Sequence, residues 1–297
     1  MSEIRNNDFN FTTEDVKNLL SANKTLFKET GQIFNQYGNK PLLDSIAFQE
    51  LANPSFSKLA DDVHSRGLLS MEGAADHLIA FTDLLIEPVK TIAPWTCVRG
   101  LLESCALACW FLDPSIDVKT RVGRCFAFRY KGFEEQIKFF RKVNDQAKID
   151  YVKQRIIKVE SDAISLGFSP LLNRNGDLNG IAQNMPSITE LIELTLNREF
   201  DYRLLSAIAH GHHWAIQQIG FRVIETINSE GKTIKGLKKS LDNNFIFYIG
   251  MVSVTSFSKV LWYIWKLNGW NLEELSKLLN SIYDQLNFND NFRYWKS

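Results

Sequence analysis

The sequence predicts an all-α protein, a multi-helix bundle with one small β-hairpin near 221–235. Apolar residues recur at helical spacing over long stretches, and residues that cap helix ends precede several of these stretches. Two segments, 95–112 and 245–265, are apolar on nearly every side, which is typical of helices at the centre of a bundle. With 297 residues, of which 45% are hydrophobic, the chain can bury a sizeable core.

Residues 1–90 are predicted to form an acidic helical segment at the N-terminus. Thr12 and Asp15 have the spacing of a capping pair and open a helix that continues to about Asn35. Between 1 and 87 the chain has 13 acidic and 7 basic residues, a net charge of −6. The further helices predicted here are 42–66, which Asn53 and Pro54 divide into two, and 70–86, which Pro88 ends.

Residues 91–297 are predicted to form the main helical bundle, which carries the candidate site. We expect this bundle and the acidic segment to form one continuous fold. The predicted helices are 95–112; 117–166, with a break near Asn144 and Asp145; 187–197, opened by the capping pair Ser187 and Glu190; 201–217; 241–267, ended by Asn268 and Gly269; and 272–286, capped by Asn271.

Two segments of this second part lack a helical pattern. Residues 167–186 form a long loop rich in Asn and Gly, and such loops are uncommon unless they are functional or mobile. We therefore expect this loop to cover the site helix. The β-branched residues on either side of Asn-Ser-Glu-Gly at 228–231 predict the hairpin.

The four cysteines indicate a reducing compartment. They are Cys97, Cys105, Cys109 and Cys125, they lie in apolar surroundings, and none forms a CxxC pair, so they are predicted to be small buried hydrophobic residues. The N-terminal sequence has no apolar signal region, and we expect a cytoplasmic protein. The apolar segment 245–265 contains Lys259 and several hydroxyl residues, which favours a buried core helix over a membrane span.

The segment 119–158 is strongly basic, although the whole chain has a formal net charge of zero. It has 12 basic residues against 4 acidic ones, and phenylalanines are interleaved with them. A basic surface with nearby aromatic rings suits a phosphate backbone with stackable bases. The alternative is that the rings face the core and the basic residues form a solvated face. The candidate nucleic-acid contacts are Arg121, Arg124, Arg129, Lys131, Lys138, Arg141 and Lys142.

The segment 201–217, DYRLLSAIAHGHHWAIQ, concentrates the titratable chemistry of the chain. As one helix it places Arg203 and His210 on one stripe, with Ser206, His210 and His213 on the neighbouring stripe. His212 is expected to point elsewhere. Gly211 would stand inside this helix at a cost of roughly 1 kcal/mol, which indicates that something packs closely against it.

The residues of this segment raise three possible chemistries. A metal shared by His210 and His213 would need further ligands that no motif supplies, so no metal or other cofactor is predicted. A cysteine nucleophile is disfavoured because thiols in apolar surroundings are inert. General acid–base chemistry by His210, with Arg203 stabilising negative charge, suits an imidazole and a guanidinium near neutral pH.

The segment from Arg203 to His210 is similar to the R-x4–6-H motif of HEPN-type helical proteins. Many of those are metal-independent endoribonucleases of toxin–antitoxin and antiphage systems, commonly with the site at a dimer interface. The resemblance implies that His210 acts as acid and base at the 2′-hydroxyl and that Arg203 binds the scissile phosphate. RNA and a second copy of the chain are the partners that it implies. The supporting residues predicted around the pair are Arg99, Glu103, Ser206, His213 and Tyr202. The alternative for Arg99 and Glu103, which lie one turn apart, is an ion pair that satisfies itself within its own helix.

A second resemblance covers more of the chain. The segments 99–113, RGLLESCALACWFLD, and 202–211, YRLLSAIAHG, together resemble uncharacterised bacterial helical proteins. That likeness implies no established activity. The alternative to a ribonuclease is therefore a non-catalytic binding or regulatory protein that pairs with a protein from the same operon, in which Arg203 and His210 have structural roles.

Overall fold

The computed structural model describes residues 10–38, 40–227, 232–239 and 241–286. These residues form eleven α-helices and two antiparallel hairpins, which confirms the predicted all-α fold with a small β component. The helices are α1 (Thr13–Tyr37), α2 (Ile46–Leu51), α3 (Ser57–Leu84), α4 (Ala93–Leu112), α5 (Val118–Lys142), α6 (Gln146–Ser165), α7 (Ile188–Leu196), α8 (Glu199–Ala209), α9 (His213–Ile216), α10 (Asn243–Asn268) and α11 (Leu272–Gln285).

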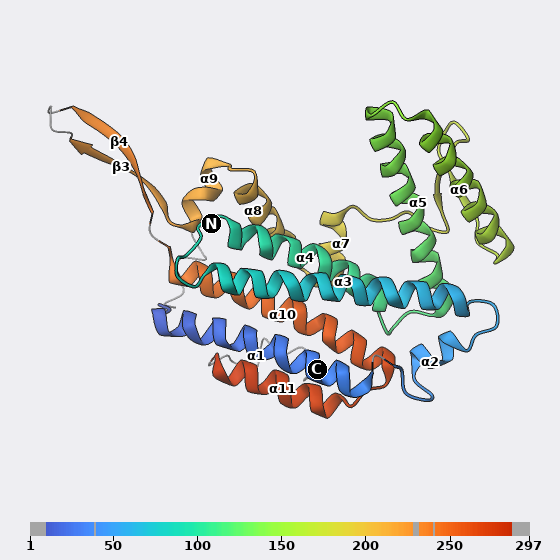
Figure 1. Ribbon diagram of the computed structural model, residues 1–297, viewed down its shortest axis with the longest axis horizontal. Coiled ribbons are helices and arrows are strands. Elements are labelled where there is room, and N and C mark those ends of the chain that lie inside the picture. The colour runs from blue at the N-terminus through green and yellow to red at the C-terminus, as the bar shows by residue number, and fades with distance from the viewer. Residues whose placement is uncertain (1–9, 39, 228–231, 240, 287–297) are drawn as a thin grey trace.

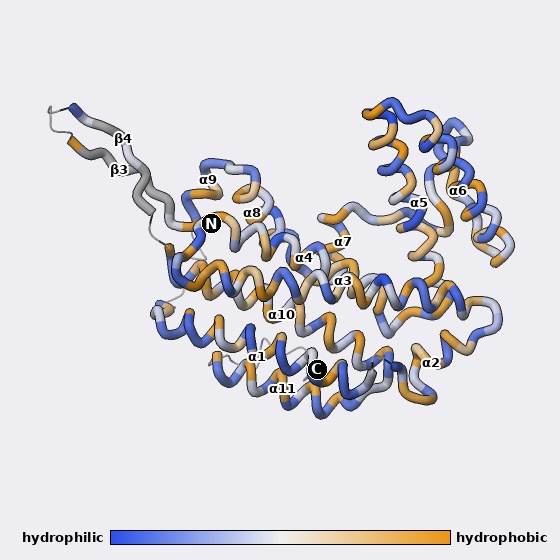
Figure 2. Tube along the Cα trace, in the orientation of Figure 1, coloured by the Kyte–Doolittle hydropathy of each residue, from blue (hydrophilic) through white to orange (hydrophobic). Residues whose placement is uncertain are grey.

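The helices stack in layers around α4 and α10 (Figure 1). α1 and α11 pack side by side below α10, α3 runs along α4, and α7 and α8 lie on α4 from the other side. α1 and α11 alternate between hydrophilic and hydrophobic residues along their length (Figure 2), as helices with one face towards the core do. One hydrophobic cluster contains residues of all these helices, including Leu19, Leu101, Ile208 and Val254.

Local sequence signals set most of the helix ends. The Thr12 hydroxyl accepts the backbone N–H of Asp15, whose side chain accepts the N–H of Thr12, so the predicted capping box opens α1. The same reciprocal pair, Ser187 with Glu190, opens α7. The predicted break between Asn53 and Pro54 separates α2 from α3. The expected separate helix 70–86 is wrong, because α3 continues without interruption from Ser57 to Leu84.

α5 and α6 form an arm that projects from the bundle (Figure 1). The two helices pack against each other around a second, smaller hydrophobic core, in which Val122, Phe126, Tyr130 and Phe133 are buried. Most aromatic rings of the basic segment therefore face a core, as the alternative to nucleic-acid contact requires, whereas Phe139 is 60% exposed. The arm therefore carries its own apolar interior, and its charged residues lie at its base and on its outer faces.

The two hairpins are short and lie outside the helical layers. β3 (Phe221–Ile227) pairs with β4 (Thr233–Lys239) and extends away from the bundle (Figure 1), as predicted, although the turn 228–231 lies outside the described residues. β1 (Pro170–Leu172) pairs with β2 (Leu178–Ile181), so the expected structureless loop 167–186 contains a hairpin. Its hairpin packs against α5, and only its last residues, 184–186, lie near α8, so the prediction that the loop covers the site helix is wrong.

Two helices among the described residues are long and apolar enough to cross a membrane, namely α4 and α10. Of their most apolar windows, 61% and 78% respectively are buried inside the fold. Core helices of soluble proteins have the same length and composition. Within α10 the hydroxyls of Ser253 and Thr255 donate to the carbonyl oxygens of Ile249 and Met251, which satisfies them without an outside partner.

Candidate functional site

α8 ends before the histidines, so the prediction of a single helix over 201–217 is wrong. His210 is the C-terminal cap, and Gly211 follows it in the left-handed region at φ 71°. The N–H of Gly211 donates to the Ile208 carbonyl at 3.0 Å, and that of His212 donates to the Ala207 carbonyl at 2.9 Å. These two bonds form a Schellman motif, which glycine favours because it has no Cβ. The chain then turns and forms α9.

The turn changes where each histidine lies. His210 and His212 line a common cleft, whereas His213 begins α9 and is exposed outside it. The expectations that His212 points elsewhere and that His213 supports His210 are therefore wrong. No described atom outside its immediate neighbours lies within 4 Å of the position that a Cβ would take on Gly211. Gly211 is thus required by its backbone angle and not by close packing.

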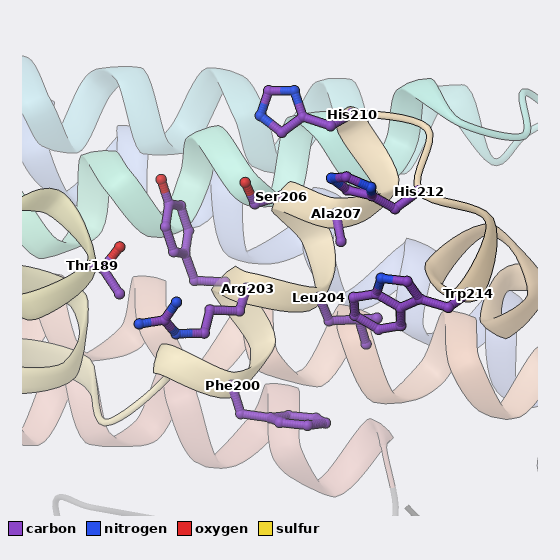
Figure 3. A pocket seen from close by; sticks show the side chains of 10 residues that line it. Thr189, Phe200, Arg203, Leu204, Ser206, Ala207, His210, His212 and Trp214 are labelled. Atoms are coloured by element: carbon purple, nitrogen blue, oxygen red, sulfur yellow. The ribbon is translucent and has the colours of Figure 1, made fainter.

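Arg203 and His210 open onto the same cleft, which we name the α8 cleft (Figure 3). Its volume is about 570 Å³. The buried face of α8, with Leu204, Leu205 and Ile208, fixes the helix on the bundle, and the opposite face presents the polar residues. The lining residues are Thr189, Phe200, Tyr202, Arg203, Leu204, Ser206, Ala207, His210, His212 and Trp214.

The charged groups of the α8 cleft are accessible to solvent. The Arg203 side chain is 66% exposed, and its Nε donates to Oε1 of Glu199 at 2.6 Å, one helical turn away. His210 is also exposed, and its ring centroid lies 6.4 Å from that of His212. The cleft therefore combines one guanidinium, held by a surface ion pair, with two imidazoles.

Two aromatic side chains add exposed apolar surface to the α8 cleft. Phe200 is 50% exposed and Trp214 is 47% exposed, although residues of this type are usually more buried. In the view of Figure 3 the Trp214 ring overlaps Leu204, and the Phe200 ring lies apart from both. Phe200, Thr189 and His212 are site residues that the sequence pattern did not predict. The available signal was the His-Gly-His sequence at 210–212, which is compatible with a helix end as well as with a helix interior.

Tyr202 connects the α8 cleft to α4. Its hydroxyl donates to Oε1 of Glu103 at 3.0 Å, and the same oxygen accepts a hydrogen bond from Nε of Arg99 at 3.1 Å. The Arg99 guanidinium lies 5.6 Å from the centre of the Tyr202 ring. Burial raises the pKa of Tyr202, so its hydroxyl stays protonated and remains a donor. Arg99 and Glu103 thus support a wall of the α8 cleft through Tyr202.

Three arginines of the basic segment hold the base of the arm. Arg121 is completely buried and donates to Glu50 and to the carbonyls of Phe111 and Asp113, so its predicted contact with nucleic acid is wrong. Arg124 donates to the Trp110 carbonyl, and burial lowers its pKa. Arg129 lies 3.5 Å from Asp62. These three side chains therefore interact with carboxylates and carbonyl oxygens of the chain itself.

The remaining predicted nucleic-acid contacts lie on the outside of the arm. Lys131 and Lys138 are exposed but pair with Glu134 and Glu135, at 2.9 and 2.7 Å. Arg141 and Lys142 are exposed at the end of α5. Of the seven predicted contacts, Arg141 and Lys142 at the tip of the arm are therefore the ones best placed to offer positive charge to a polyanion.

Metal and thiol chemistry find little support in the described part of the chain. It contains no group of three or more His, Cys, Asp and Glu side chains that could hold a metal ion. Burial raises the pKa of both Cys109 and Cys125 to about 12, and it raises the pKa of Cys105 as well. Their thiols consequently stay protonated near neutral pH, which disfavours a cysteine nucleophile.

Comparisons of the chain with protein-family models, with curated proteins and with solved structures found no match. The α8 cleft is therefore interpreted from its own residues.

Proposed function

We propose that the α8 cleft binds RNA and cleaves it without a metal ion. The observation that carries this proposal is the shared exposure of Arg203 and His210 in one cleft, from a single helix and its C-terminal cap. A second imidazole, His212, lies in the same cleft. Cleavage of RNA through its own 2′-hydroxyl needs one group to remove a proton, one to donate a proton, and one cation for the phosphate.

The chemistry assigns one role to each side chain. His210 removes the proton of the 2′-hydroxyl as that oxygen forms a bond to phosphorus. Protonated His212 gives a proton to the 5′-oxygen as the bond between phosphorus and that oxygen breaks. Arg203 stabilises the negative charge on the phosphorane with its planar guanidinium. The products are a 2′,3′-cyclic phosphate and a free 5′-hydroxyl.

The surroundings of the three groups are compatible with a nucleic acid. The exposed rings of Phe200 and Trp214 offer faces on which bases stack. Arg141 and Lys142 at the tip of the arm supply positive charge that guides a polyanion by long-range attraction. A role in bacterial defence or growth control, and a two-fold dimer that brings two α8 clefts together, belong to the same proposal.

The test is cleavage of a fluorescent single-stranded RNA by purified protein in the presence of a chelator. We expect His210→Ala and Arg203→Ala each to slow cleavage by about 100-fold or more, because each removes a group that acts in the transition state. His213→Ala is the matched control, since His213 is exposed three residues from His210 but outside the cleft. A cyclic phosphate at the new 3′ end identifies the reaction.

Two results would contradict the proposal. One is the absence of cleavage by the wild-type protein over a range of RNA sequences and pH. The other is equal cleavage by wild type and His210→Ala, which would indicate a contaminating nuclease.

A second hypothesis is a non-catalytic binding or regulatory protein that pairs with a protein of the same operon. It is favoured by the ion pair between Glu199 and Arg203, because the Arg203 guanidinium already has a carboxylate partner. In that case Arg203 and His210 have structural roles, so His210→Ala lowers the stability of the fold, while neither wild type nor variant cleaves RNA.

A further inference from the structure

A second cleft adjoins the α8 cleft along α7, and we name it the α7 cleft. Its volume is about 760 Å³. Thr189 and Arg203 line both clefts, so the two are continuous. Its lining includes Met185, Pro186, Glu190, Glu193, Leu194 and Glu199.

An unusually exposed leucine stands in the α7 cleft. α7 turns Leu191, Ile192 and Leu196 into the core, whereas Leu194 points outward and is 74% exposed. An isolated exposed leucine is ordinary, but this one lies in a concave surface beside Met185 and Pro186. Covering it would remove apolar surface from water, which favours binding.

The charges of the α7 cleft are predominantly negative. The described lining residues include three carboxylates, those of Glu190, Glu193 and Glu199, and one cation, Arg203. The Glu190 carboxylate accepts hydrogen bonds from Ser187, and that of Glu193 accepts the N–H of Glu199 at 3.1 Å. Such neutral partners leave the charge of a carboxylate in place, so Glu190 and Glu193 remain available to a cation.

These features select one class of occupant. An RNA backbone is disfavoured because Glu190 and Glu193 repel its phosphates, while Glu199 already pairs with Arg203. A small molecule is disfavoured because a surface that leaves Leu194 74% exposed does not enclose its ligand. A polypeptide segment can lie along an open cleft and present apolar and basic side chains together.

We propose that the α7 cleft is a docking surface for a basic segment of another protein. Its lysine or arginine side chains pair with Glu190 and Glu193, and an apolar side chain covers Leu194. The proposal does not depend on RNA cleavage, because docking is measured by binding alone. Arg203 lies in the wall of both clefts, so the docked segment ends beside the α8 cleft.

The test measures fluorescence anisotropy of three labelled peptides of equal length, which alternate Leu with Lys, Leu with Glu, and Ser with Lys. We expect the Leu/Lys peptide to bind about 10-fold more tightly than either of the others, since it alone can both cover Leu194 with an apolar side chain and pair with the carboxylates. Added salt should weaken this binding.

Two pairs of variants locate the binding. Leu194→Ser should weaken the Leu/Lys peptide about 10-fold, whereas Leu69→Ser on α3, where the leucine is 68% exposed, should leave it unchanged. Glu193→Gln keeps the hydrogen-bond acceptor and removes the charge, and should weaken binding about 3-fold, with exposed Glu72→Gln as its control.

Thermal unfolding of each variant verifies that it is folded. Equal binding of the Leu/Lys and Leu/Glu peptides would overturn the proposal, as would equal loss in Leu194→Ser and Leu69→Ser. Binding of single-stranded RNA that is weakened by Leu194→Ser would assign the cleft to nucleic acid instead. Peptide binding without RNA cleavage would leave docking established and the ribonuclease proposal refuted.

Discussion

The buried guanidinium of Arg121 lies against the carboxylate of Glu50, with 3.0 Å between Nε and Oε2. The two residues are 71 positions apart and join α5, at the base of the arm, to α2. Nε2 of His64 on α3 lies 2.7 Å from the same carboxylate. One buried carboxylate thus holds three helices together.

Replacing Arg121 should therefore destabilise the fold strongly. We expect Arg121→Met to lower the free energy of unfolding by about 3–5 kcal/mol, because Glu50 is then buried without its main cation. The control Arg141→Met, on the exposed end of the same helix, should change it by less than about 0.5 kcal/mol. Urea unfolding followed by circular dichroism measures both. Adding Glu50→Leu to Arg121→Met should recover part of the loss, and no recovery would argue against a charge effect.

The Tyr248 hydroxyl donates to Oδ1 of Asp201 at 2.6 Å, and its removal should have a pH-dependent effect. Burial raises the pKa of Asp201 above its usual 3.8, while Tyr248 and Arg198 oppose that rise. The stability linked to Asp201 is present below pH 3.8 and is lost as pH rises through the folded pKa. Tyr248→Phe should raise the folded pKa further and extend this loss to higher pH.

We expect Tyr248→Phe to cost about 1.5–3 kcal/mol near neutral pH, where the hydroxyl bonds to an ionised carboxylate, and about 0.5–1.5 kcal/mol once Asp201 is protonated. Denaturant unfolding at a series of pH values gives the difference. Tyr151→Phe, an exposed tyrosine on α6, should show no such dependence. A constant cost across the series would contradict this assignment.

Glycine at position 250 allows α10 to approach α1 closely. A Cβ added there would overlap the side chain of Leu19, which is fully buried. We expect Gly250→Ala to destabilise the protein by about 1–3 kcal/mol through overpacking. Gly132→Ala on α5, where nothing lies within 4 Å, should instead stabilise it by about 0.5–1 kcal/mol. Thermal melting of both variants tests this, and equal shifts would contradict it.

Thiol labelling should distinguish Cys97 from the other cysteines. Burial raises the pKa of all four thiols, but Cys97 is partly exposed, whereas Cys105, Cys109 and Cys125 are buried and closed to a reagent. We expect one fast-reacting thiol in the folded protein, absent in Cys97→Ser, and four reactive thiols in denaturant. Rapid labelling of a second thiol in the folded protein would show that the core around α4 opens readily.

Local signals allowed much of the fold to be predicted from the sequence. These signals appear where expected, namely the capping boxes of Thr12 and Ser187, the break at Asn53 and Pro54, and the apolar pattern of α10. Each depends only on residues that are close together in the sequence. The long α3 was divided wrongly because Gly67 and its polar neighbours resemble an interruption. In the structure Gly67 lies directly against Leu112 of α4, and tertiary packing keeps the helix continuous.

The candidate site was predicted less completely, for two physical reasons. Whether Gly211 is inside a helix or ends one depends on its φ angle, which spacing does not reveal, and that angle decides whether His212 or His213 joins His210. The burial of Arg121 depends on Glu50, a partner far away in the sequence. Charge counted along the chain therefore overestimated how much of the basic segment faces solvent.

The arm formed by α5 and α6 has a small apolar interior of its own, and α6 packs mainly on α5. Amide protons in the outer half of the arm should consequently exchange with solvent sooner than those of α4 and α10, because opening α6 leaves the larger core intact. Unfolding then proceeds in two stages, in which the outer arm opens first and the central helices unfold last.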